Sequence, residues 1–154
     1  MKRHILAITA IIITILVVVV AIFHIQTSRF ALDSEYYGVS DIQTIDVETL
    51  NQLINGRKTF GLFVSQPSCQ ASVDLEKYLQ DFTKTYQVKF YEISFSALKD
   101  NNMIPGLRFY PSFVIFHDGE VVDFLEADSD EDATAYTSTD GFKDWFTEHA
   151  QLDI

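Results

Sequence analysis

The chain passes from an apolar strand pattern into a helical pattern at Phe63-Val64-Ser65-Gln66-Pro67-Ser68-Cys69-Gln70-Ala71-Ser72. Cys69 is the only cysteine among the 154 residues. Ser72 stands where a second cysteine would complete a C-x-x-C redox motif. The thiol therefore has no disulfide partner in its own chain, and this absence restricts the chemistry open to it.

The patterns on either side of this segment alternate between helix and strand. From Gln70 to Tyr86 apolar residues recur at helical spacing, with charged and amide residues between them. Asp118-Gly119 between two apolar runs is a strong hairpin signal. A strand–helix–strand crossover followed by a hairpin predicts a small mixed α/β sheet with helices on both faces. The expected elements are helix 47–55 between a cap at Asp46 and Gly56, strand 59–65, helix 70–86, strand 88–95, a loop at 101–106, strands 112–116 and 121–124, and helix 141–150 capped by Asp140 or Thr139.

This order of elements resembles the thioredoxin superfamily. The strand 60–65, the motif Cys69-Gln70-Ala71-Ser72 and the helix that ends at Tyr86 are similar to the family's active-site strand, motif and helix. The stretch Gly106-Leu107-Arg108-Phe109-Tyr110-Pro111-Ser112-Phe113-Val114-Ile115-Phe116-His117-Asp118-Gly119-Glu120 is similar to its proline loop and the hairpin that follows. The resemblance implies a thioredoxin-like fold over residues 45–151 and a cis peptide bond before Pro111. The context of the motif also resembles the bacteriocin-transport accessory branch of the superfamily.

The chain departs from the family pattern at four places. Ser72 replaces the second cysteine, and Ser68 replaces the tryptophan that usually precedes the motif. Gln70-Ala71 replaces Gly-Pro. The strand 59–65 contains no acidic residue, so the buried aspartate of thioredoxins has no counterpart here.

The site expected from these residues is a single-thiol, Cys-x-x-Ser site. Cys69 at the start of a helix is the expected nucleophile, because the helix N-terminus favours the thiolate, and Ser72 is expected to hydrogen-bond it. By resemblance, Tyr110 and Pro111, together with Ser68 and Gln70, would bind an extended substrate segment. Mixed-disulfide capture, isomerisation resolved by the substrate's own thiol, and reduction helped by an external thiol remain possible. The alternative is that Cys69 is a small hydrophobe without a redox role.

The first part of the chain has a different character. Ile5 to Phe23 is an uncharged, almost wholly aliphatic run of 19 residues, which as a helix would be about 28 Å long, near the thickness of a bilayer's hydrocarbon. The run is longer than the core of a signal peptide and is followed by no small-x-small site, so a retained anchor at 5–23 is expected rather than a cleaved signal. Lys2 and Arg3 predict a cytoplasmic N-terminus at 1–4, a stalk at 24–44 and an extracytoplasmic domain.

The charge balance limits the classes of molecule that the chain is expected to bind. All 22 acidic residues follow the apolar run, together with all but two of the 11 basic ones. This balance argues against nucleic acid and anionic lipid as partners. Asp128, Asp130 and Asp132 have the spacing of a calcium loop, but Ala133 occupies the glycine position, which favours a solvated acidic loop or a contact with a basic partner. Four scattered histidines form no zinc pattern, and no cofactor is expected.

Two functional hypotheses follow. The first is a membrane-anchored, extracytoplasmic thioredoxin-like protein that exchanges with thiols or disulfides of exported proteins and needs an external resolving thiol to act as an enzyme. The second is a non-catalytic thioredoxin-fold adaptor or accessory of a peptide or bacteriocin exporter, in which the same groove binds polypeptide and Cys69 is incidental.

Overall fold

The computed structural model describes residues 29–99 and 103–152. The predicted cytoplasmic N-terminus and membrane anchor therefore lie outside the described residues. None of the described helices is long and apolar enough to cross a membrane. The elements are β1 (Phe30–Ala31), η1 (Ser34–Tyr36), β2 (Asp41–Thr44), α2 (Val47–Asn55), β3 (Phe60–Ser65), α3 (Gln70–Tyr86), β4 (Lys89–Ser94), α4 (Phe95–Leu98), β5 (Ser112–His117), β6 (Glu120–Phe124), η2 (Ala133–Tyr136), α5 (Thr139–His149) and β7 (Ala150–Gln151).

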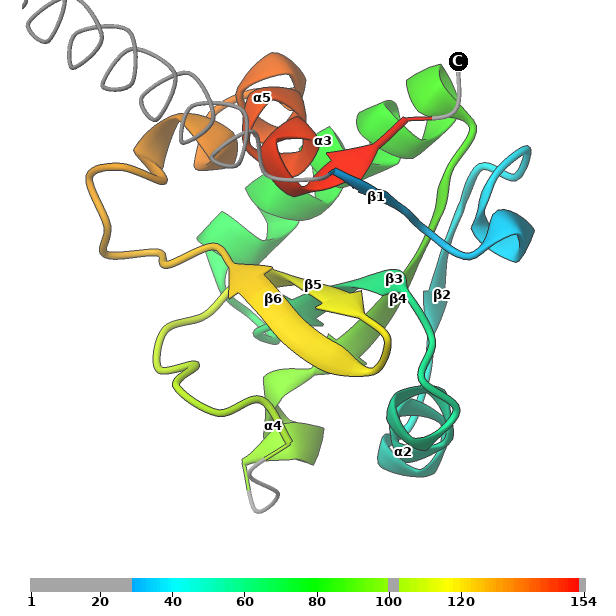
Figure 1. The fold of residues 1–154 in the computed structure, drawn as a ribbon. Helices are drawn as coiled ribbons and strands as arrows, with labels where there is room; N and C mark the ends of the chain where they lie inside the picture. Colours follow the sequence, from blue (N-terminus) through cyan, green and yellow to red (C-terminus); the bar gives the residue numbers. More distant parts are fainter. Residues whose placement is uncertain (1–28, 100–102, 153–154) are drawn as a thin grey trace, which may run out of the picture.

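A five-stranded mixed sheet forms the centre of the domain, in the order β2-β4-β3-β5-β6. The strands β2, β4 and β3 are parallel, and β5 and β6 run antiparallel to their neighbours. Helices α3 and α5 cover one face, and α2 and α4 lie on the other (Figure 1). This arrangement confirms the predicted mixed sheet with helices on both faces.

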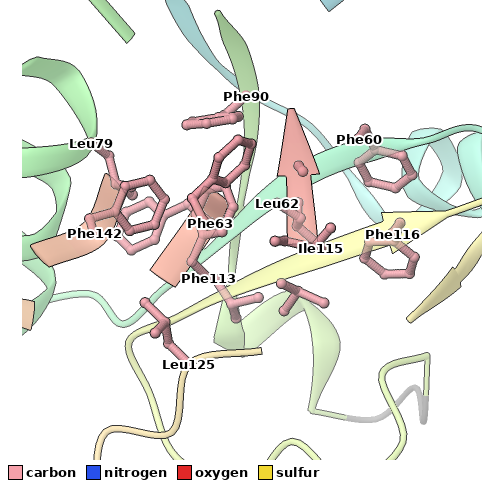
Figure 2. Close-up of a cluster of buried hydrophobic side chains, with 14 of the residues drawn as sticks. Phe60, Leu62, Phe63, Leu79, Phe90, Phe113, Ile115, Phe116, Leu125 and Phe142 are labelled. Carbon is pink, nitrogen blue, oxygen red and sulfur yellow. The ribbon is translucent and has the colours of Figure 1, made fainter. Parts of the chain in front are cut away.

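Aromatic side chains fill the space between the sheet and the α3–α5 layer. Phe90 and Phe113 meet edge to face at 4.7 Å between ring centroids, and Phe142 packs against Phe113 at 4.9 Å (Figure 2). Gly61 on β3 leaves room for these rings, since a Cβ there would lie 2.6 Å from Phe113 Cζ and 2.8 Å from Phe90 Cδ1. The phenylalanine-rich sequence thus supplies a well-filled core without a disulfide.

Local signals placed most helices and strands correctly. Asp46 caps α2 by accepting a hydrogen bond from the Thr49 N–H, as predicted. The Asp118-Gly119 turn has positive φ at both residues (51° and 79°), as a two-residue hairpin of type I′ requires. The predicted cap of the last helix was wrong by one residue or more: Ser138 caps α5 by accepting from the Gly141 N–H, and Thr139 is already helical.

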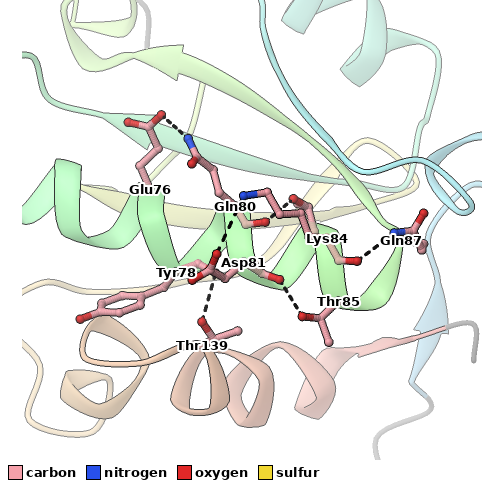
Figure 3. Close-up of polar contacts among 9 residues, drawn as sticks. Glu76, Tyr78, Gln80, Asp81, Lys84, Thr85, Gln87 and Thr139 are labelled. Atoms are coloured by element: carbon pink, nitrogen blue, oxygen red, sulfur yellow. Dashed lines mark hydrogen bonds and ion pairs between the residues drawn. The ribbon is translucent and has the colours of Figure 1, made fainter.

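Hydrogen bonds within helix α3 and between α3 and α5 stabilise the helix and fix its position. Within the helix, Gln80 donates to Glu76 and Thr85 donates to the Asp81 carbonyl (Figure 3). Across the helix pair, the Thr139 hydroxyl at the start of α5 donates to the Tyr78 carbonyl at 3.5 Å. The contact fixes the start of α5 along α3.

Residues 30–44 belong to the folded domain, which corrects the predicted stalk over these residues, while its first part, 24–28, lies outside the described residues. Asp41–Thr44 forms the edge strand β2 on β4, and β1 pairs in parallel with β7 in a two-stranded terminal sheet. The Gln151 side chain donates to the Arg29 carbonyl at 2.7 Å, and the Tyr37 hydroxyl donates to the Gln151 carbonyl at 2.7 Å. The physical reason for the difference is tertiary pairing, since each of these short strands finds its partner far along the chain.

Candidate functional site

The thiol lies in the turn between β3 and α3. Ser68 has a left-handed backbone (φ 63°), and the Cys69 N–H donates to the Gln66 carbonyl at 3.2 Å. Cys69 is the N-cap residue of α3, and its carbonyl accepts from the Ser72 N–H at 3.1 Å. The side chain is a free thiol, partly exposed, and it makes no capping hydrogen bond to the helix. The Cys69 sulfur therefore lies at the N-terminus of α3, and no N–H of the first helical turn forms a capping hydrogen bond with it.

Ser72, the residue in the position of a second thiol, stabilises this turn. Its side chain is buried (6% exposed), and its Oγ accepts a hydrogen bond from the Gln66 N–H at 2.8 Å. The bond ties the end of the strand to the first turn of α3. The predicted hydrogen bond from Ser72 to the thiolate stays a prediction.

The proline loop meets the same end of the sheet. The Tyr110–Pro111 peptide bond is cis, which confirms the prediction. Ser112, the first residue of β5, pairs with Val64 in an antiparallel ladder, so Pro111 lies beside the end of β3 from which the Cys69 turn leaves. The fold thus brings the predicted motif and the predicted proline loop to neighbouring strand ends.

An aromatic pair that the sequence analysis missed stands at this strand end. Phe95 begins α4 immediately after β4, and its ring stacks on Tyr110 at 3.8 Å between centroids. Because β4 and β5 flank β3, the two rings meet across the end of β3. Burial raises the pKa of the Tyr110 phenol. The placement of Phe95 at the carboxyl end of a parallel strand was the available signal, since functional groups gather at such ends.

The surface around the thiol combines polar and apolar side chains. Ser68 and Gln70 are exposed on either side of Cys69 in the sequence, and the Gln70 amide donates to Asp74 at 3.0 Å. Val73, one turn into α3, is 57% exposed, and Phe109 on the proline loop is 45% exposed. They are two of the four large apolar side chains that are exposed among the described residues.

The helix η2, which follows the acidic loop at residues 126–132, is tied to the proline loop. The Tyr136 hydroxyl in η2 donates to the Pro111 carbonyl at 2.8 Å and to the Leu125 carbonyl at 3.1 Å. Asp132 accepts from the Glu126 N–H at 2.7 Å and so closes the loop on itself. Burial raises the pKa of Tyr136, and Asp132 adds to the shift. Within residues 29–99 and 103–152, no three metal-ligating side chains gather.

Comparison with known proteins identifies the fold. No protein-family model and no curated protein matches the chain. Solved structures do: an oxidised thioredoxin from Plasmodium falciparum is 12% identical with a TM-score of 0.55, over 71% of this chain and 99% of that one. A mutant thioredoxin from Halobacterium salinarum is 16% identical with a TM-score of 0.56, over 77% and 97%. The chain has the thioredoxin fold.

A thioredoxin from Malassezia sympodialis is a further match, 17% identical with a TM-score of 0.54, over 71% of this chain and 91% of that one. These likenesses show the thioredoxin fold, and they support the resemblance drawn from the sequence. They do not single out the bacteriocin-transport accessory branch, which stays a prediction. Within this thioredoxin fold, Cys69 and Ser72 occupy the start of α3, next to the loop of the cis proline.

Proposed function

We propose that this chain is a membrane-anchored, extracytoplasmic thioredoxin-like protein whose single thiol forms mixed disulfides with exported proteins. The observation that carries the proposal is a free, partly exposed thiol at the N-terminus of α3, beside the cis-proline loop. Support for the anchor is the uncharged run 5–23 preceded by Lys2 and Arg3.

The chemistry follows from the presence of a single thiol. The Cys69 thiolate attacks one sulfur of a partner's disulfide, a new S–S bond forms, and the partner's other sulfur leaves as a thiolate that takes up a proton. Ser72 cannot attack this mixed disulfide, because a hydroxyl is not ionised at neutral pH. A second thiol, from the partner or from a small thiol such as glutathione, attacks the partner's sulfur and returns Cys69 as thiolate. Tyr110, Pro111, Ser68 and Gln70 would hold the partner's extended chain.

A trapping experiment tests this proposal. Cells that make the full chain are treated with an alkylating agent, and their proteins are separated without reductant. We expect partner adducts of the chain that disappear on reduction and in the Cys69→Ser variant. Equal adducts in the variant, or none in the parent, would refute mixed-disulfide capture.

A second candidate function is a non-catalytic adaptor beside a peptide exporter, for which the exposed Val73 and Phe109 side chains would supply apolar contacts. In that case the surface around Cys69 and the proline loop binds polypeptide without covalent chemistry. The Cys69→Ala variant would then support the cellular phenotype as well as the parent, while a Val73→Asp and Phe109→Asp double variant would not. Loss of the phenotype in Cys69→Ala alone supports thiol exchange instead.

A further inference from the structure

The folded domain begins very close to the proposed anchor. Arg29 is fixed by its carbonyl to the Gln151 side chain, and β1 starts at the next residue. Only residues 24–28 separate Phe23, the end of the apolar run, from Arg29. Even fully extended, this connection reaches about 20 Å, so the terminal sheet of β1 and β7 cannot lie far from the end of the span.

The surface beside the terminal sheet carries two cationic side chains, on a domain whose net charge is strongly negative. A shallow groove of about 360 Å³ is lined by Arg29, Lys143, Thr147, Ala150, Gln151 and Leu152. Lys143 also lies over the Tyr86 ring, 5.7 Å from its centroid. The next stripe around α5 carries Asp144 and Glu148. Asp140 lies one turn before Lys143, but the residues that line the groove include both cations and no carboxylate side chain.

We propose that this groove rests on the membrane surface, with Arg29 and Lys143 against the phosphate groups of anionic lipids. The inference rests on the anchor in the proposed function. The whole domain is acidic, so it would not bind such a membrane from solution, but a tether of this length holds one face within one or two Debye lengths of the headgroups. The local cations then select the face that turns toward the bilayer.

Site-specific labelling of the full chain in vesicles tests the orientation. In a Cys69→Ser background, Thr147→Cys places a thiol in the groove, and the matched control Asn51→Cys places one at an exposed position of α2, a helix on the other face of the sheet. Each variant is reconstituted in vesicles of phosphatidylglycerol and phosphatidylcholine in equal parts. The rate at which each variant reacts with a negatively charged maleimide in vesicles is divided by its rate in detergent, which corrects for differences in intrinsic thiol reactivity. The fraction of inward-facing chains affects both variants equally.

We expect the vesicles to slow Thr147→Cys at least about threefold more than Asn51→Cys. The extra slowing should disappear when Arg29→Glu and Lys143→Glu are added, a change that leaves the Arg29 carbonyl bond in place. Equal slowing at the two positions, or extra slowing that survives the charge reversal, would overturn the orientation and leave the anchor standing. If the chain does not float with the vesicles after an alkaline carbonate wash, both the anchor and the orientation are wrong.

Discussion

The Ser72 hydroxyl accepts a 2.8 Å hydrogen bond from the Gln66 N–H, so the residue in the place of a second thiol closes the turn that carries Cys69. A hydroxyl suits this position because it is a strong acceptor, whereas a thiol is a weak one. The replacement therefore removes the resolving sulfur and at the same time stabilises the geometry of the remaining one.

Ser72→Ala should lower the free energy of unfolding by about 1 kcal/mol, because the Gln66 N–H loses its acceptor in a partly buried turn. Urea denaturation measures the change. Thr85→Ala is the matched control in the same helix, since the Thr85 hydroxyl only donates to the exposed Asp81 carbonyl. An equal loss of unfolding free energy in both variants would show that the Ser72–Gln66 hydrogen bond contributes no more to stability than an exposed one.

Ser72→Cys should restore an intrachain resolving thiol. The new side chain would lie at the first turn of α3, three residues beyond Cys69. Under mild oxidation we expect two thiols per chain to be lost by titration, and partner adducts in the trapping experiment to fall, because the introduced thiol would release them. Adducts that persist at the parental level would contradict the claim that the missing second thiol is what stops the reaction.

The stacked Phe95 ring should matter for polypeptide partners more than for small reagents, because it supports Tyr110 rather than the sulfur. Phe95→Ala is expected to slow the reaction of Cys69 with a peptide disulfide roughly 2- to 10-fold, the value of one aromatic pair. The rate with a small aromatic disulfide should stay the same. Phe95→Tyr, which keeps the stack, serves as the control. Equal slowing with both reagents would indicate a general distortion of the site.

Ionisation of the Tyr136 phenol should make the free energy of unfolding depend on pH in the alkaline range. Burial raises its pKa above the unfolded value of about 10, so its contribution is complete below that value and is lost as pH rises beyond it. Tyr136→Phe should cost about 1–2 kcal/mol at pH 7, where the bonds to Pro111 and Leu125 are lost. Urea denaturation at about pH 7 and about pH 10.5 should show a smaller difference between variant and parent at the higher pH. A constant difference would contradict the proposed ionisation.

The sequence predicted those elements that carry their own local signals. Helices α2 and α3 followed from a capping aspartate and from apolar spacing, and the hairpin followed from Asp118-Gly119. The edge strand β2, Asp41–Thr44, carries a single apolar residue, and its partner β4 lies more than 40 residues away. A short polar strand of this kind has no pattern of its own, so the sequence alone predicts a stalk there.

In the candidate site, too, the residues with local sequence signals were predictable, and the contacts between distant segments were not. Cys69 and Ser72 were recognisable from spacing, and Pro111 from its flanking residues. The pairing of Ser72 with the Gln66 N–H and the stacking of Phe95 on Tyr110 depend on how strand ends meet, which no single segment encodes. For this reason the roles of Ser72 and Phe95 emerged only from the fold.

The most direct measurement of the central claim is the rate at which Cys69 reacts with a small aromatic disulfide at neutral pH. The full chain in mild detergent is compared with a synthetic peptide of residues 66–72. The peptide has the same local sequence but lacks the remainder of α3 and the rest of the fold. The proposed exchange function predicts that the folded chain reacts about tenfold faster than the peptide, and that one mixed disulfide per chain persists until glutathione is added. A folded chain that reacts no faster than the peptide would contradict the function as a thiol-exchange site.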